Sequence, residues 1–345
     1  MLKTFNTIHF DITYFCNYHC EYCYQGLEKQ QIHISDEVFD NFFCFLSRLK
    51  EQYTVHLIGG EPFLYPRFYE MCERIVKMGH KVSCTTNFSL PEFALEKFLN
   101  IAKNNISFFE ISMHLTQIKD LSEFYNKLVW FKEKSSLEYR DFQINCVLTN
   151  ENFAQVKEIS QKLKQLGFSL NIQRIFDDKD YEIYREEIEN WLKENKCIDI
   201  PLNVVINKHR CDVCKKPCRT GTKFFKVLID GKVTRCFTNQ HYGYNLLGDF
   251  SKNSRVKILK DFSPCLSLDN KCRCLFGFNK LGQIEHNKRK TLEFYFDIVS
   301  SKVRFSYLYI KYYFYKIAKN INPRLKEKSK LYKKKIIQKA KVYNH

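Results

Sequence analysis

Glycine, proline and long apolar runs are all scarce in this sequence. The 345 residues include 11 Gly and 7 Pro, too few for the flexible or proline-rich linkers that join independent domains. No stretch approaches the roughly 18 uninterrupted apolar residues that a membrane-spanning helix requires. The N-terminus, MLKTFNTIHFDIT, lacks the charged-then-apolar pattern of a secretory signal. We therefore expect a cytoplasmic protein without spanning helices.

Cysteine, by contrast, is abundant and clustered. There are 15 Cys, and in a chain without a secretion signal that number favours metal or redox chemistry over a disulfide framework. Three lie in FCNYHCEYCY at residues 15–24, and seven lie between residues 211 and 274. Four others fall inside predicted helices or strands and are expected to be core thiols: Cys44, Cys72, Cys84 and Cys146.

The first half of the chain alternates short apolar runs with amphipathic stretches. Strands are expected at 7–13, 54–58, 81–86, 107–112, 142–148 and 168–173, and helices at 35–50, 66–79, 91–103, 117–134 and 152–166. Six β/α units in a row predict a parallel sheet with its helices outside, curled toward a partial (β/α)6 TIM-like barrel. Functional loops then belong at the C-terminal ends of the strands, where FCNYHCEYCY follows the first one.

Three parts of the chain are expected: a barrel over 1–196, a smaller unit over 197–285 and a tail over 286–345. A helix at 181–195 connects the first two. The stretch KFFKVLIDGKVTRCF (223–237) predicts a β-hairpin that turns at Asp230-Gly231.

Cys16, Cys20 and Cys23 allow three interpretations. Their i, i+4, i+7 spacing could be a buried stripe on a helix, although the residues between them are polar or aromatic. A zinc site would need a fourth ligand such as His19 or His9. A [4Fe–4S] cluster held by three thiolates would leave one iron open to an exogenous ligand.

The Cys-x3-Cys-x2-Cys pattern, with Tyr22 before its last cysteine, resembles the signature of radical S-adenosylmethionine (SAM) enzymes. The resemblance implies a partial barrel with this loop after the first strand and SAM chelating the open iron. In that family, electron transfer from the cluster cleaves SAM to a 5′-deoxyadenosyl radical that abstracts a substrate hydrogen. Catalysis is then carried by the cofactor, and no further catalytic residue is assigned.

A second motif, IGGEP at residues 58–62, strengthens the resemblance. In the family, a turn like Gly59-Gly60-Glu61 after the second strand receives the SAM amino group. Softer matches imply SAM contacts at strand ends three, four and six: Asn87, Ser112 and Arg174. For Arg174 a surface salt bridge is the alternative. The chain departs from the family where Phe88 replaces a common Gly and His114 a common Asp.

The second cysteine group resembles the SPASM or twitch extension of radical SAM enzymes, which binds one or two auxiliary [4Fe–4S] clusters. A zinc ribbon is the alternative, since Cys211-x2-Cys214 alone would fit one. The features that match are a cysteine before the hairpin, one at its end, Leu-Gly-Asp at 247–249 and late cysteines. The resemblance implies one auxiliary cluster on Cys218, Cys236, Cys272 and Cys274. Cys211, Cys214 and Cys265 are candidates for a second.

The C-terminal tail carries most of the charge. The chain's net charge is +18, and residues 286–345 contribute 17 Lys/Arg against 3 Asp/Glu, or +14. Aromatic rings mixed with lysines over 304–319 favour peripheral association with an anionic surface at the inner membrane, rather than nucleic acid or a merely solvated helix.

These observations favour a radical SAM oxidoreductase or maturase that oxidises or cross-links a peptide or protein side chain, with flavodoxin or ferredoxin as electron donor. The same chemistry on a small metabolite, such as a sugar or nucleotide derivative, is the first alternative. A non-catalytic iron–sulfur or zinc RNA-binding protein is the second.

Overall fold

The computed structural model describes residues 6–23, 32–174, 184–195, 220–236 and 246–259. Its first half alternates six strands with six helices, as the sequence predicts. The strands are β1 (Thr7–Thr13), β2 (Thr54–Gly59), β3 (Lys81–Thr86), β4 (Ile106–Met113), β5 (Phe142–Leu148) and β6 (Leu170–Arg174). The helices are α1 (Asp36–Leu46), α2 (Phe68–Lys77), α3 (Glu92–Ala102), α4 (Leu121–Lys134), α5 (Phe153–Gln165) and α6 (Glu186–Asn195).

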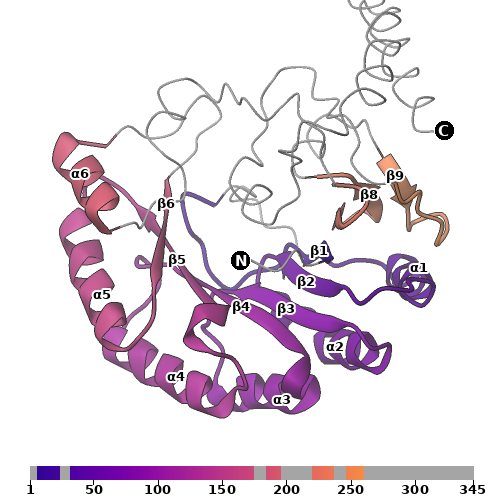
Figure 1. The fold of residues 1–345 in the computed structure, drawn as a ribbon, viewed down its shortest axis with the longest axis horizontal. Helices are drawn as coiled ribbons and strands as arrows, with labels where there is room; N and C mark the ends of the chain where they lie inside the picture. The colour runs from indigo at the N-terminus through magenta and orange to yellow at the C-terminus, as the bar shows by residue number, and fades with distance from the viewer. Residues whose placement is uncertain (1–5, 24–31, 175–183, 196–219, 237–245, 260–345) are drawn as a thin grey trace, which may run out of the picture.

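The six strands form one parallel sheet in the order β6-β5-β4-β3-β2-β1. Helices α1 to α6 lie in an arc around one face of the sheet, as Figure 1 shows. The sheet is not closed, and the predicted partial TIM-like barrel is confirmed. No helix among the described residues has the length and apolar character to cross a membrane.

The two faces of the sheet differ in chemistry because side chains alternate along each strand. On the helix side, Ile8, Phe10, Val55, Leu57 and Ile111 are almost fully buried in the core. The opposite face, which we call the lumen face, carries polar side chains instead, among them His56, Glu110 and Asn145. This polar alternation is unusual for parallel strands, which normally bury apolar residues on both faces.

The predicted hairpin continues the barrel sheet. Strand β7 (Phe224–Val227) pairs in parallel with β1, and β8 (Lys232–Thr234) and β9 (Leu246–Asp249) follow it in antiparallel order. Lys226 of β7 forms a buried ion pair with Asp11 of β1. The Asp230-Gly231 turn is confirmed, with Gly231 at a φ of +84°. The hairpin therefore shares its sheet with the barrel, while the proposed limits of a second domain stay a prediction.

One sequence expectation was wrong. Cys72, Cys84 and Cys146 are buried, but Cys44 is exposed on α1. Helix α1 turns its phenylalanines toward the sheet, and position 44 falls on the opposite side, where the thiol accepts a hydrogen bond from Arg48 at 3.1 Å.

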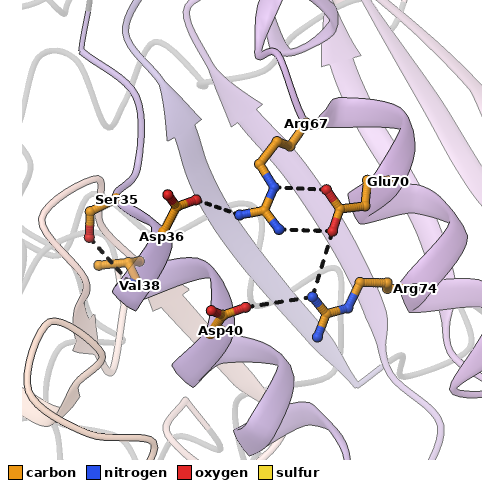
Figure 2. Close-up of polar contacts among 7 residues, drawn as sticks. All are labelled: Ser35, Asp36, Val38, Asp40, Arg67, Glu70 and Arg74. Carbon is orange, nitrogen blue, oxygen red and sulfur yellow. Dashed lines mark hydrogen bonds and ion pairs between the residues drawn. The ribbon is translucent and has the colours of Figure 1, made fainter.

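Helices α1 and α2 are joined by a surface network of charges (Figure 2). Arg67 contacts Asp36 on α1 at 2.5 Å and Glu70 on α2 at 2.7 Å. Its guanidinium also lies 3.6 Å from the centre of the Phe39 ring. Ser35 accepts a hydrogen bond from the Val38 N–H and caps α1, as predicted. The network thus fixes two helices that cover the first strands.

We expect Arg67→Ala to lower the free energy of unfolding by about 1 kcal/mol, because exposed ion pairs and cation–π contacts are each worth a fraction of that. Urea denaturation measures the change, and Lys77→Ala on the exposed side of α2 is the control. If the two variants unfold at the same urea concentration, the charge network between α1 and α2 does not contribute to stability.

Candidate functional site

The three cysteines of the first motif lie in the loop that leaves β1. Cys20 is buried, whereas Cys16 and Cys23 are partly exposed, and no disulfide links any of the cysteines that the structure describes. Two donors point at the Cys16 sulfur: the backbone N–H of Tyr18 at 3.4 Å and the Asn87 side-chain amide at 3.7 Å. Such N–H···S contacts stabilise a thiolate, the form that binds metal.

The Gly-Gly-Glu-Pro turn is fastened to the start of this loop. The Gly60 N–H donates to the Thr13 carbonyl at 2.6 Å and the Glu61 N–H to the Phe15 carbonyl at 2.8 Å. A Cβ on Gly59 would lie 2.0 Å from the Thr13 oxygen, and one on Gly60 2.1 Å from the Phe15 oxygen. The two glycines are therefore required for the backbones to approach.

Glu61 links that turn to the end of β3. Its carboxylate is fully buried and accepts hydrogen bonds from the Thr86 hydroxyl at 2.9 Å and the Asn87 N–H at 2.7 Å. Burial raises the pKa of Glu61 to about 7, although the hydrogen bonds it accepts oppose the shift. Because Asn87 also contacts Cys16, these contacts connect the ends of β1, β2 and β3.

A pH dependence of stability follows from Glu61. Its folded pKa of about 7 exceeds the ordinary 4.5, so the folded protein holds this proton more tightly than the unfolded chain. The contribution to the free energy of unfolding is therefore largest at pH below the unfolded pKa and falls as pH rises through the folded pKa. In protein free of iron and SAM, we expect Glu61→Gln to gain about 2 kcal/mol relative to wild type between pH 5 and pH 8. Urea denaturation at both pH values measures this, and parallel curves would contradict it.

Tyr22, between Cys20 and Cys23, packs on His114, one of the two residues that depart from the family pattern. Its hydroxyl lies 3.1 Å from His114 Nδ1, and the two rings stack with centroids 5.9 Å apart. Burial, followed by the neighbouring Cys20, raises the pKa of Tyr22 and keeps its phenol protonated. Tyr18 meets the same imidazole edge-on. His114 thus forms part of the wall around the cysteine loop.

Phe88, the other departure, takes the conformation that glycine would favour. Its φ is +58°, and its ring is buried against Phe109, Phe124 and Phe131. A left-handed residue costs about 1 to 2 kcal/mol, and burying a phenylalanine ring is worth a similar amount or more. Burial of the Phe88 ring thus offsets the cost of its left-handed backbone, and the turn that positions Asn87 forms without a glycine.

The two remaining residues that are predicted to contact SAM, Ser112 and Arg174, lie on opposite faces of the sheet. Ser112 lies on the lumen face of β4, two residues before His114, so both residues are on the same side of the sheet. Arg174 lies on the helix face of β6, where it forms a buried ion pair with Glu189 of α6 at 2.7 Å. The ion pair considered as an alternative is therefore present, but buried, and a contact between Arg174 and SAM stays a prediction.

The second cysteine group is represented in the structure by Cys236, which is buried just beyond β8. The other predicted auxiliary ligands lie outside the described residues: Cys211, Cys214, Cys218, Cys265, Cys272 and Cys274. The basic tail over 286–345 lies outside them as well.

The first loop offers three thiols, Cys16, Cys20 and Cys23, the ligand type that holds iron–sulfur clusters. Within the described part of the chain, no three Cys, His, Asp or Glu side chains gather as the ligands of one ion. A [4Fe–4S] cluster instead spreads its thiolates over separate irons. With N–H donors directed at Cys16, the donor set suits such a cluster.

Residues 10–176 match the model of the Radical SAM superfamily. A tungsten-containing aldehyde ferredoxin oxidoreductase cofactor-modifying protein of Pyrococcus furiosus is 24% identical over 172 residues, 46% of this chain and 48% of that protein. An S-adenosylmethionine-dependent nucleotide dehydratase of a Thermoplasmatales archaeon is 40% identical over 76 residues, 22% of this chain and 26% of that protein. The chain thus spans about half and about a quarter of these relatives.

Among solved structures, SuiB of Streptococcus suis bound to S-adenosylmethionine superposes with a TM-score of 0.52 at 13% identity, covering 80% of this chain and 68% of that one. At this identity the likeness shows the fold. Residues 10–176, the part of the chain that matches the Radical SAM superfamily model, hold the cysteine loop and the Gly-Gly-Glu-Pro turn.

Proposed function

We propose that the chain is a radical SAM enzyme in which Cys16, Cys20 and Cys23 hold a [4Fe–4S] cluster with one iron left open for SAM. When bound, these cofactors supply a 5′-deoxyadenosyl radical that abstracts a hydrogen atom from the substrate. The observation that carries the proposal is the set of contacts joining the cysteine loop to the Gly-Gly-Glu-Pro turn and to Asn87.

The chain's own residues would position these cofactors. Gly59 and Gly60 hold the turn against the backbone of the cysteine loop, and Glu61 would accept a hydrogen bond from the SAM amino group. Tyr22 and His114 form an aromatic wall that limits water on one side of the loop. Ser112 lies on the same strand face and is a candidate for a SAM or substrate contact.

For the substrate we propose a peptide or protein side chain that is oxidised or cross-linked. SuiB, which shares the fold, has been solved bound to the precursor peptide SuiA. A SPASM or twitch extension with one or two auxiliary clusters on the second cysteine group belongs to the same proposal. So do a flavodoxin or ferredoxin donor and a membrane-associated tail.

A nucleotide derivative is the second candidate. It is favoured by the similarity to the nucleotide dehydratase, which at 40% is the higher of the two identities above. The two candidates share the same radical chemistry and differ in the molecule that occupies the lumen face.

The test begins with protein reconstituted anaerobically with iron and sulfide. Given SAM and dithionite, it should form 5′-deoxyadenosine and methionine. Adding each nucleoside triphosphate in turn, and following its consumption, separates the second candidate from the first. Bound zinc without 5′-deoxyadenosine would overturn the proposal in favour of a non-catalytic metal protein.

A further inference from the structure

The lumen face holds a chain of hydrogen bonds that the radical SAM motifs do not use. Thr85 Oγ1 donates to Glu110 Oε2 at 2.6 Å, and His56 Nε2 lies 2.9 Å from Thr85 Oγ1. Since the Thr85 hydroxyl donates its hydrogen to the carboxylate, its oxygen accepts a hydrogen bond from His56 Nε2–H. His56 Nδ1 in turn hydrogen-bonds Ser83. The chain ends at Glu110.

These four residues come from three adjacent strands in register. His56 is paired with Ser83 across β2 and β3, and Thr85 with Glu110 across β3 and β4. Phe108, two residues before Glu110, stacks on the His56 ring at 4.9 Å. The carboxylate is thus held firmly beside an apolar floor.

Glu110 has one oxygen left for a ligand. Its side chain keeps 20% of its surface exposed although it sits in the middle of β4. Of the residues that the structure describes, none hydrogen-bonds Oε1. Gln143, directly opposite on β5, donates its amide to Asn145 instead.

The charges around Glu110 favour an ionised carboxylate. Burial alone would raise the pKa of Glu110, but nearby His56 and the Thr85 hydroxyl outweigh it and leave the pKa below its usual value. Asp11 and Lys226 form a buried ion pair on the β1–β7 side of the sheet. Lys81 lies at the N-terminal end of β3.

The position of Glu110 along β4 sets its distance from the cysteine loop. His114, which contacts Tyr22 of the cysteine loop, is four residues further along the strand direction, or about 13 Å at the usual rise. Glu110 therefore lies deeper in the lumen than the cysteine loop.

We propose that Glu110 Oε1 binds a hydrogen-bond donor of the substrate, a protonated amine or a hydroxyl carried on an alkyl group that packs on Phe108. Thr85 and His56 act as positioning residues that hold the carboxylate toward the lumen. This inference rests on the proposed function, because it places the substrate beneath the SAM site. A charge-assisted hydrogen bond is stronger than a neutral one, so an amine should bind more tightly than an alcohol.

The test uses the full-length reconstituted protein with SAM and two probes, n-butylammonium chloride and n-butanol, detected by saturation-transfer NMR. We expect Glu110→Gln to weaken n-butylammonium binding about tenfold or more, since it removes the charge but keeps an acceptor. Glu96→Gln, an exposed carboxylate on α3, is the control and should leave both probes unchanged. If n-butanol binds the wild type more tightly and Glu110→Ala removes it, the donor is a hydroxyl.

Thr85→Val provides a second variant should Glu110→Gln fail to fold. It leaves the carboxylate but removes its anchor, and should reduce the preference for amine over alcohol, which a general loss of stability would not do. Equal binding of both probes by wild type and Glu110→Gln would refute the inference, as would no binding to a wild type that forms 5′-deoxyadenosine. Binding that depends on Glu110 in a protein that never cleaves SAM would instead refute the proposed function alone.

Discussion

Replacing Cys20 with alanine is expected to abolish 5′-deoxyadenosine formation, a fall of about a thousandfold or more, because the reaction has no route without the cluster. Cys20 is the buried member of the three cysteines. Iron content after reconstitution and the visible iron–sulfur absorption should fall together with activity.

The matched control is Cys44→Ala. Cys44 is an exposed thiol on α1 that contacts Arg48 and lies outside the cysteine loop, and surface substitutions of this kind change stability little. Its iron content and activity should equal those of the wild type. Wild-type iron content and 5′-deoxyadenosine in Cys20→Ala would refute the ligand assignment.

Gly60→Ala is expected to destabilise the protein by about 3 kcal/mol, within the range of severe single substitutions, and to suppress SAM cleavage. A Cβ there would lie 2.1 Å from the Phe15 carbonyl oxygen and 2.8 Å from the Tyr14 carbonyl carbon. The backbone can relieve the overlap only by moving away. That movement breaks the hydrogen bonds from Gly60 to Thr13 and from Glu61 to Phe15.

Gly79→Ala separates this overlap from the general cost of losing a glycine. Gly79 has a φ of +79°, but nothing lies within 4 Å of its Cβ position, so the expected cost is the left-handed conformation alone, about 1 to 2 kcal/mol. Urea denaturation and the 5′-deoxyadenosine assay measure both variants. If Gly60→Ala is as stable and as active as Gly79→Ala, the close approach of the Gly-Gly-Glu-Pro turn to the cysteine loop is not required for stability or for SAM cleavage.

The barrel could be predicted because its signals are local. Each of the six strands is an apolar or alternating run, and breaks such as Gly79 and Gly167 adopt the positive φ expected after a helix. Local signals also explain why Cys44 is wrongly expected in the core. They predict the helix, but they do not say which of its sides faces the sheet. The large phenylalanines of α1 decide that by packing against the sheet.

The motifs were equally visible, but their partners were not. His114 departs from the family pattern in the sequence, but its contact with Tyr22 joins residues 92 positions apart. For Glu110 the available signal was a charged residue inside a predicted strand. A search for ionisable residues at alternate positions of β2, β3 and β4 would have singled out His56 and Glu110 together.

The sequence by itself determined the β/α order, the three-cysteine loop after the first strand and the glycine turn after the second, because spacing and periodicity are properties of the chain. Only the tertiary structure decided which distant groups meet. Strand register brought Glu110 to Thr85 and His56, and alternation along β6 turned Arg174 toward the helices and into an ion pair with Glu189. Shifting a strand by one residue would exchange its two faces, so the lumen chemistry depends on a register that no local pattern specifies.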